Sequence, residues 1–311
     1  MDFRLSEEQR AIGEAVAVLL AKHAGWERAA ALAARGAYDF ELEEALAGAG
    51  FLDVALADGT GPLEAALVVE AVARGAGAVA AGAAALAVPL ALGRSLPAPV
   101  ALADAAHPGA VRFAAHARSL VLLRGEGARV VALQPGDVPP VASHFGYPLG
   151  DVAALCEGQG DDLGPGSAAR LRDAWRVALA AETSGTLAGA LGATLEYLTQ
   201  RRQFGRPIAS FQAVQHRLAA CFVQVEGARW LAFEAAARGA PAEAAAVAAA
   251  HAAFAAKRVF AETHQLSGAI GYTREHPLHV YSMRLQALRL ELGGAASHAR
   301  AAARARWDAP S

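Results

Sequence analysis

The chain reads Tyr197-Leu-Thr-Gln-Arg-Arg-Gln-Phe-Gly-Arg-Pro-Ile-Ala-Ser-Phe-Gln-Ala-Val-Gln215 at the turn that decides how its second half folds. A long apolar helical pattern runs into this turn from Ala168 and breaks at Gly205 and Pro207. Glycine and proline both end helices, so the pattern predicts a tight connection between two long helices. We expect the second helix to begin at Ser210, whose hydroxyl suits an N-cap.

Three arginines lie at this break, Arg201, Arg202 and Arg206. Guanidinium groups beside the N-terminus of a helix form a candidate anion site, because the backbone N–H groups and the helix dipole add to their charge. A solvated arginine cluster explains the same residues, since cations are also stable at the C-terminal end of the preceding helix. The residue types alone leave both interpretations open.

Two motifs resemble the acyl-CoA dehydrogenase family. The first is Gln-Arg-x-x-Phe-Gly-(Arg/Lys)-x-Ile-x-x-Phe-Gln-x-x-Gln, from Gln200 to Gln215. The second is Gln265-Leu-Ser-Gly-Ala-Ile-Gly-Tyr-Thr-Arg-Glu-His-Pro277, which is similar to the family pattern Gln-x-x-Gly-Gly-x-Gly-(Phe/Tyr)-x-x-Glu. In that family the first motif crosses a dimer interface and holds the FAD of the neighbouring subunit. Two motifs in this order and spacing are far more specific than either alone.

The resemblance implies FAD as the cofactor and an acyl-CoA as the substrate. It places Arg201 on the FAD pyrophosphate, Phe204 against the cofactor and Gln212 in contact with it. The second motif implies pyrophosphate and adenosine contacts by three residues, Gln265, Gly268 and Ala269. The family has glycine where this chain has Ala269, and a methyl group there would crowd a phosphate.

Composition limits the class of protein. Hydrophobic residues make up 55% of the 311-residue chain, and many are alanine, which favours helix but buries little area. We therefore expect close helix packing and association between chains. The 28 basic and 30 acidic residues nearly cancel, which gives no support to a nucleic-acid partner. Cys156 and Cys221 are isolated, which predicts no disulfide and fits a reducing compartment such as the cytoplasm.

The sequence also gives no support to a secreted protein, a membrane protein or a metalloprotein. The N-terminal stretch has early acidic residues and lacks a basic segment, so we expect no secretory signal. The apolar stretch 76–92 contains glycines and Pro89, which favours a buried helix over a membrane span. The histidines are scattered without the spacing of metal ligands, so we expect no metal site.

The chain is predicted to be mainly α with a small β insert. We expect an N-terminal helical domain over residues 1–96, a reduced middle β domain over 97–166 and a C-terminal helical bundle over 167–311. The resemblance implies the same three-part fold with a larger middle domain. A capping box from Ser6 to Gln9 predicts the first helix. Further helices are expected at 41–47, 63–73, 76–92, 168–203, 211–238, 241–266 and 279–304, and strands at 111–114, 119–123 and 129–133.

The sequence lacks a carboxylate at the positions where the resemblance implies the catalytic base. Family members remove the α-proton of the thioester with a carboxylate while the flavin accepts the β-hydride. The two positions at which members carry that glutamate correspond to Gly293 and Trp175. Glu291 and Asp173 each lie two residues before one of them, and two residues along a helix turn a side chain by about 200°. Glu291 is the best remaining candidate base, but we expect its side chain to point away from the position of the family's glutamate. The alternative interpretation of Glu291 is an acid that is solvated or paired with an arginine.

The absence of a base leaves three hypotheses. The chain is similar to the short subunits of heteromeric actinobacterial acyl-CoA dehydrogenases that shorten steroid side chains, in which an α2β2 partner carries the base and both chains frame the flavin. This favours the base-lacking chain of a heterotetramer. The alternatives are a self-sufficient enzyme, in which a homo-oligomer uses a displaced base, and a helical assembly module without flavin. The residues do not identify the acyl group.

Overall fold

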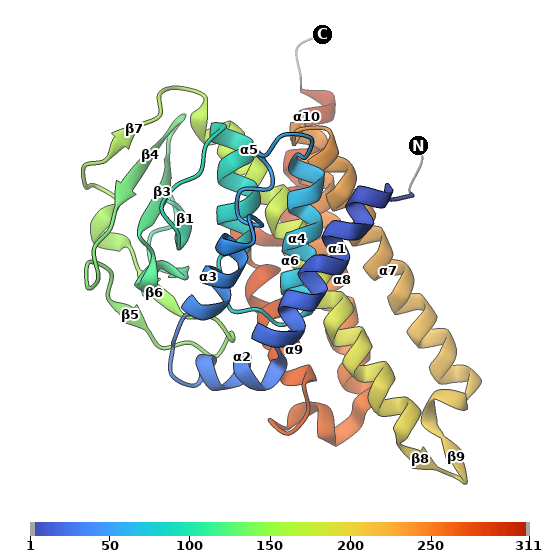
Figure 1. Ribbon diagram of the computed structural model, residues 1–311. Coiled ribbons are helices and arrows are strands. Elements are labelled where there is room, and N and C mark those ends of the chain that lie inside the picture. The colour runs from blue at the N-terminus through green and yellow to red at the C-terminus, as the bar shows by residue number, and fades with distance from the viewer. Residues whose placement is uncertain (1–3, 309–311) are drawn as a thin grey trace.

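The computed structural model describes residues 4–308, in which helices precede and follow a small β segment (Figure 1). The N-terminal helices are α1 (Glu7–His23), α2 (Trp26–Ala33), α3 (Phe40–Gly48), α4 (Pro62–Arg74) and α5 (Val88–Leu92), the last continuing a π-helical turn, Gly82–Ala87. Ser6 and Gln9 form the predicted capping box at the start of α1. α2 was not predicted from the sequence.

The predicted helix 76–92 is wrong in its first part. The main chain at Ala76 is left-handed, with φ of 57°, and helical structure resumes only after Ala80. Gly77 is packed so closely that an added Cβ would lie 2.6 Å from Cγ1 of Val72. The chain therefore turns sharply here to bring the π-helical segment against the bundle.

Two small sheets form the β segment on the left of Figure 1. One has the order β1 (Val100–Asp104), β3 (Ser119–Arg124), β4 (Gly127–Ala132) and β7 (Asp161–Asp162), with β1 and β3 parallel. The other has the order β2 (Ala110–Arg112), β6 (Leu149–Asp151) and β5 (Pro140–Val141). The strands predicted at 119–123 and 129–133 are confirmed, whereas the one at 111–114 ends early because Phe113 is left-handed.

The second half is a helical bundle around α6 (Ser167–Gln200). A hairpin of β8 (Arg202–Gln203) and β9 (Arg206–Pro207) leads into α7 (Gln212–Ala237), then α8 (Ala242–Ser267), α9 (Leu278–Leu288) and α10 (Gly294–Trp307). The expected capping role of Ser210 is wrong: Phe211 precedes α7, and the Ser210 hydroxyl donates to the Pro207 carbonyl. The predicted helix 279–304 is also wrong, because it divides into α9 and α10 around a 3₁₀ turn, Glu291–Gly293.

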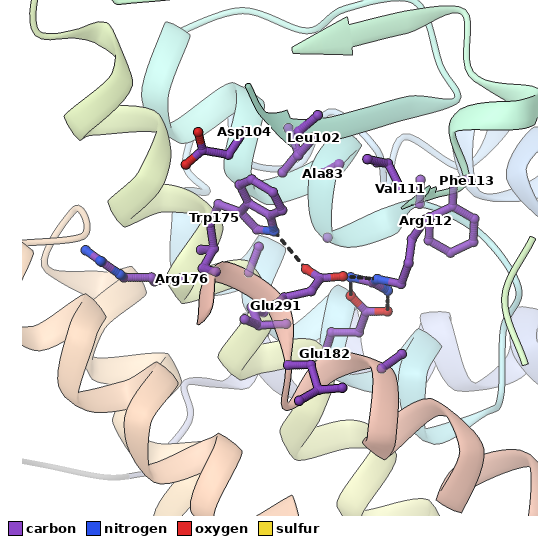
Figure 2. A pocket seen from close by; sticks show the side chains of 18 of the residues that line it. Ala83, Leu102, Asp104, Val111, Arg112, Phe113, Trp175, Arg176, Glu182 and Glu291 are labelled. Atoms are coloured by element: carbon purple, nitrogen blue, oxygen red, sulfur yellow. Dashed lines mark hydrogen bonds and ion pairs between the residues drawn. The ribbon is translucent and has the colours of Figure 1, made fainter. Parts of the chain in front are cut away.

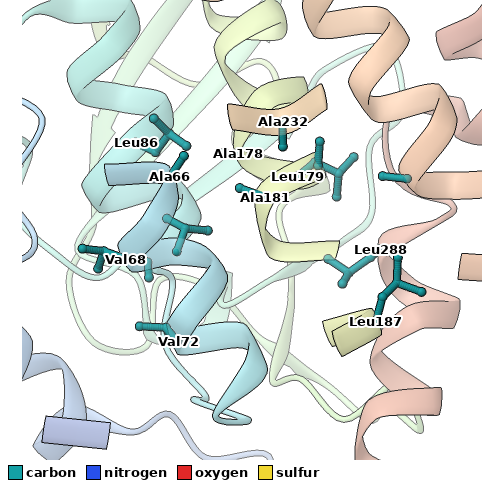
Figure 3. Packing of buried hydrophobic residues seen from close by; sticks show 14 of the residues in the cluster. Ala66, Val68, Val72, Leu86, Ala178, Leu179, Ala181, Leu187, Ala232 and Leu288 are labelled. Atoms are coloured by element: carbon teal, nitrogen blue, oxygen red, sulfur yellow. The ribbon is translucent and has the colours of Figure 1, made fainter. Parts of the chain in front are cut away.

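One apolar core joins the N-terminal helices to the bundle (Figure 3). Valines of α4 and small residues of α6 meet across it, and Gly185 of α6 approaches α4 so closely that a Cβ would lie 2.1 Å from the Glu70 carbonyl oxygen. The alanine-rich sequence thus achieves stability through close helix packing. The segment Ala242–Tyr272 is long and apolar enough to span a membrane, but 61% of its most apolar window is buried in this core.

Candidate active site and cofactor surface

A cavity of about 580 Å³ lies between the β segment, α6 and the α9–α10 turn (Figure 2). Its walls are mostly apolar, and its charged lining residues are Asp104, His107, Arg112, Arg172, Arg176, Glu182 and Glu291. A mostly apolar pocket with a few converging polar groups is the usual form of a small-molecule site.

Arg112, Glu182, Glu291 and Trp175 form a connected polar group in this cavity, the Arg112 network (Figure 2). The Arg112 Nε donates to Glu291 Oε1, and its two terminal nitrogens donate to Glu182 at 2.7 and 3.1 Å. The Trp175 indole donates to Glu291 Oε2 at 3.0 Å. Both carboxylate oxygens of Glu291 are therefore engaged by donors.

The expectation that Glu291 points away is wrong, because residue 291 is not in an α-helix. α9 ends at Leu288, and the following turn contains Leu292 in a left-handed conformation, with φ of 52°. The rotation rule for helices does not apply across such a turn. Glu291 is directed into the cavity beside Arg112, where it is arginine-paired, as its alternative explanation supposed.

Both family positions for the base also line the cavity, and neither holds an acid. Trp175 fills one with an indole. Gly293 at the other has φ of 83°, and a Cβ there would lie 2.9 Å from the Ser297 Cβ. Asp173 pairs instead with Arg176 at 2.7 Å, and burial raises the pKa of the Asp173 carboxyl against the opposing effect of that arginine.

Tyr147 contacts the Arg112 network, and Arg284 packs against the Tyr147 ring. The Tyr147 hydroxyl donates to Glu182 at 3.0 Å, and the guanidinium carbons of Arg112 and Arg284 lie 4.7 and 4.9 Å from the centroid of its ring. Burial raises the pKa of Tyr147, so the hydroxyl remains a donor. Sequence reasoning missed Arg112, Glu182 and Tyr147. The available signal was a lone acid, Glu182, within the apolar run of α6.

Replacing Gly293 with alanine should destabilise the fold. A left-handed backbone is strained for alanine, and the new methyl group would collide with Ser297. We expect the free energy of unfolding to fall by roughly 1–3 kcal/mol. Gly239→Ala is the control, since Gly239 has φ of 75° and open space around its Cβ direction. Chemical denaturation of both variants should show the larger loss for Gly293→Ala; equal losses would mean that the contact with Ser297 contributes nothing.

His298 of α10 should make the protein sensitive to acid. It is completely buried, and burial, with the nearby Arg176 charge, lowers its pKa to about 4, from about 6.5 in an unfolded chain. The folded state therefore resists protonation, so its stabilising contribution is complete above about pH 6.5 and is lost as the pH falls toward 4. At pH 4 this loss should approach about 3 kcal/mol.

The variant His298→Leu tests this sensitivity, because leucine is similar in volume and does not titrate. Its unfolding free energy should decline less between pH 6.5 and 4 than that of the parent protein, whereas His144→Leu, at an exposed position, should leave the decline unchanged. An unaltered acid profile in His298→Leu would contradict the assignment.

The predicted FAD residues lie away from this cavity, on the hairpin and the loop after α8. Arg201, Phe204 and Gln212 are all exposed, and Phe204 is 92% exposed. Phe204 and Gly205 both have positive φ, 54° and 79°, the conformation of a tight two-residue hairpin turn. The turn thus presents a large aromatic ring to solvent in a backbone conformation that phenylalanine rarely adopts.

The second motif lies at the same end of the bundle. Gln265, Gly268 and Ala269 are exposed, and residues 268–272 form a 3₁₀ turn. An ion pair of 2.6 Å between Arg217 and Glu262 holds the first part of α7 beside the last part of α8, so the structure brings the two motifs to one region (Figure 1).

This region fits an anionic dinucleotide. The α7 N-terminus has no side-chain cap, and helix N-termini of this kind bind phosphate groups through their backbone N–H groups. Arg206 lies 4.0 Å from the Phe211 ring, which orders a guanidinium there. At Gly268 there is open space where a side chain would project. The donor set therefore matches a pyrophosphate, with Ala269 adding a methyl group to the exposed loop.

The hairpin lies far from the cavity of its own chain. Glu182 in the cavity and Gln200 at the hairpin are 18 residues apart on α6, or about 27 Å along a helix. The hairpin and the cavity are therefore separate regions of this chain. Within residues 4–308 no group of three or more histidine, cysteine or acidic side chains is placed to hold a metal.

Comparison with known proteins identifies similar chains. Residues 168–306 match the model of the family described as acyl-CoA dehydrogenase, C-terminal domain. The chain is 34% identical over 304 residues to acyl-CoA dehydrogenase IpdE2 of Mycobacterium tuberculosis, covering 89% of this chain and 91% of the relative.

Solved structures share the whole fold. The ChsE4-ChsE5 complex from Mycobacterium tuberculosis contains a chain that superposes with a TM-score of 0.83 at 25% identity, over 100% of both chains. A steroid acyl-CoA dehydrogenase variant, Tcur3481-Tcur3483, matches with a TM-score of 0.79 at 26% identity, over 96% of this chain and 97% of the other.

Proposed function

The chain belongs to the acyl-CoA dehydrogenase family, and from this premise we propose that it is the base-lacking, flavin-holding subunit of a heteromeric acyl-CoA dehydrogenase. The family consists of flavoproteins that oxidise acyl-CoA thioesters with FAD. The observation that carries the proposal is that both base positions line the cavity and hold Trp175 and Gly293. The similar ChsE4-ChsE5 structure is a complex, which supports a partner chain, and the similar Tcur3481-Tcur3483 protein is a steroid acyl-CoA dehydrogenase, which supports a role in lipid or steroid catabolism.

In the proposed reaction, the residues of this chain bind the cofactor. Arg201 and the N–H groups at Gln212 would hold the FAD pyrophosphate of the partner, with Phe204 packed on the cofactor and Gln265, Gly268 and Ala269 completing the contact. Bound FAD supplies the hydride acceptor for the β-carbon. The partner supplies the carboxylate that removes the α-proton. We place the complex in the cytoplasm, which the two buried, unpaired cysteines support.

The flavin content of the purified protein tests this assignment. The chain should carry little FAD when purified alone, and co-expression with candidate partner chains of the same family should raise the ratio of flavin to this chain toward a fixed stoichiometry. Absorbance at the flavin maximum and total protein give the ratio. Full flavin loading and acyl-CoA-dependent bleaching of the chain alone would contradict the proposal.

A self-sufficient enzyme is the second candidate, because Glu291 lies in the cavity after all. The pairing of both its oxygens argues against a proton acceptor that is free to reach a substrate. A helical module without flavin is disfavoured, because the exposed donors at the hairpin and the α8 loop match a dinucleotide.

We expect no active monomer. The cofactor surface and the cavity are too far apart to meet within one chain, and Phe222, Val223 and Phe254 expose apolar surface on α7 and α8. Sedimentation should therefore detect dimers or larger assemblies whenever activity is present. Turnover by a species that sediments as a single 31.8 kDa chain would contradict this expectation.

A further inference from the structure

A buried polar pair lies beneath the second-motif turn, Gly268–Tyr272. His264, in the last turn of α8, is 5% exposed, and so is Ser267 at the end of that helix. Within residues 4–308 neither ring nitrogen of His264 nor the Ser267 hydroxyl has a hydrogen-bond partner. Buried polar groups without partners are uncommon in folded proteins, so this pair requires an explanation.

The second-motif turn packs directly on this pair. The centroid of the Tyr272 ring lies 4.5 Å from that of the His264 ring, and the Phe260 ring lies at the same distance from His264. The main chain at Gly271 comes so close that an added Cβ would lie 3.0 Å from the Ser267 Cβ and 3.5 Å from the His264 Nδ1. Tyr272 is 74% exposed, so His264 provides the aromatic surface on which the end of the turn rests.

We propose that His264 is a positioning residue for the cofactor surface, and that its uncharged imidazole under Tyr272 fixes the second-motif turn for the FAD pyrophosphate. The proposal rests on the proposed flavin role of this chain. It adds a residue that acts on the cofactor through the turn, without touching the cofactor itself. A turn that is already in place binds its ligand more tightly, because ordering it costs no further free energy.

Only the uncharged imidazole suits this position. A protonated ring carries an N–H donor on each nitrogen, and among the described residues neither nitrogen has a partner. Burial lowers the pKa of His264, and the neighbouring His276 lowers it further. Because a buried charge without a partner is costly, protonation should favour conformations in which the turn leaves His264 and the ring reaches water.

The charged groups around the turn do not stabilise a protonated His264. His276 is the neighbour that acts on the pKa of His264, and it opposes protonation. Glu262 is paired with Arg217 at 2.6 Å, and within residues 4–308 no carboxylate forms an ion pair with His264. The titratable and charged groups on the elements that pack here are Glu196 and Tyr197 of α6, Arg217 of α7, Glu262 of α8, Tyr272, Arg274, Glu275, His276 and, in α9, His279.

The affinity for FAD should therefore weaken as the pH falls. With the turn displaced, His264 has an ordinary pKa of about 6.5, whereas under the turn its pKa is lower, so closure is fully favoured above that pH and progressively less below it. The apparent Kd rises as the fraction of protein with a closed turn falls. At pH 5.5 the exposed imidazole is about tenfold more protonated than neutral, so the Kd should rise by up to about tenfold from its value at pH 7.5.

Equilibrium dialysis of FAD against the assembled complex at pH 7.5, 6.5 and 5.5 tests this expectation. His264→Phe keeps an aromatic ring that cannot be protonated, so its Kd should stay within about twofold of the parent value at pH 7.5 and should not rise at pH 5.5. His264→Leu takes its place if the first variant fails to fold. His264→Ala removes the ring and should raise the Kd severalfold at every pH. His144→Phe, at an exposed position, should keep the parent profile.

Hydrogen exchange of residues 268–273 in the full chain without FAD gives a second readout. At pH 5.5 this segment should exchange faster in the parent protein than in His264→Phe, whereas at pH 7.5 the two should agree. Comparing the two proteins at the same pH removes the intrinsic pH dependence of exchange. Circular dichroism at 222 nm at each pH separates opening of the turn from unfolding of the chain.

Three results would count against this assignment or the flavin role on which it rests. Identical pH profiles of the parent and His264→Phe would mean that His264 does not fix the turn. Tighter FAD binding at pH 5.5 that is abolished by His264→Phe would mean that the imidazolium meets the pyrophosphate directly. If no complex binds FAD, the proposed flavin role fails, and the exchange measurement alone then decides whether His264 fixes the turn.

Discussion

Arg201→Ala should release FAD from the assembled protein while leaving the helical fold intact. The guanidinium is expected to make charge-assisted hydrogen bonds to a doubly anionic pyrophosphate, each contributing about 1.5–3 kcal/mol. Losing one such bond weakens binding by roughly 10- to 150-fold. The fold should not suffer, because Arg201 is exposed just after α6, and among residues 4–308 its side chain has no ion pair.

Arg202→Ala is the matched control for this experiment. It removes the same charge from the same hairpin, at a position that the family motif leaves variable. Flavin affinity, measured by equilibrium dialysis against FAD, should fall much further for Arg201→Ala than for Arg202→Ala, with equal circular dichroism at 222 nm. Full flavin absorbance in Arg201→Ala would show that the resemblance does not carry over to this residue.

The sequence predicted the long helices and the break between α6 and α7 better than it predicted the cavity. Helices such as α6 and α7 have long apolar patterns separated by glycine and proline, so their existence followed from local chemistry, although the helix predicted over 168–203 ends at Gln200, before strand β8. The hairpin with Arg201 and Phe204 is a contiguous motif, and both side chains are exposed. The three-domain division and the individual cofactor contacts remain predictions.

The cavity could not be predicted because its residues come together only in three dimensions. Arg112 ends a short strand, Glu182 lies mid-helix and Glu291 lies in a turn, 179 residues from Arg112. The error on Glu291 had a specific cause: a continuous helix was assumed across Gly293 and Gly294, both of which take positive φ. Two adjacent glycines were the available sign that the helix would end.

The identity of the base can be decided by Glu291→Gln, which keeps the size of the side chain and one of its two acceptor oxygens but removes the proton acceptor. If Glu291 were the base of a self-sufficient enzyme, turnover should fall on the order of 10²–10⁴-fold with flavin retained. If the base lies on the partner, turnover of the complex should change by only a few-fold. We expect the second result, because the base positions hold Trp175 and Gly293 and because Arg112 and Trp175 hold both oxygens of Glu291.

Glu182→Gln distinguishes a chemical effect from a structural one. It perturbs Arg112 from the other side, and Glu182 does not correspond to a base position of the family. Equal small losses in the two variants would mean that the Arg112 network only supports the fold. A large loss confined to Glu291→Gln, together with acyl-CoA bleaching of flavin in the isolated chain, would identify Glu291 as a base that must leave Arg112 before it can act.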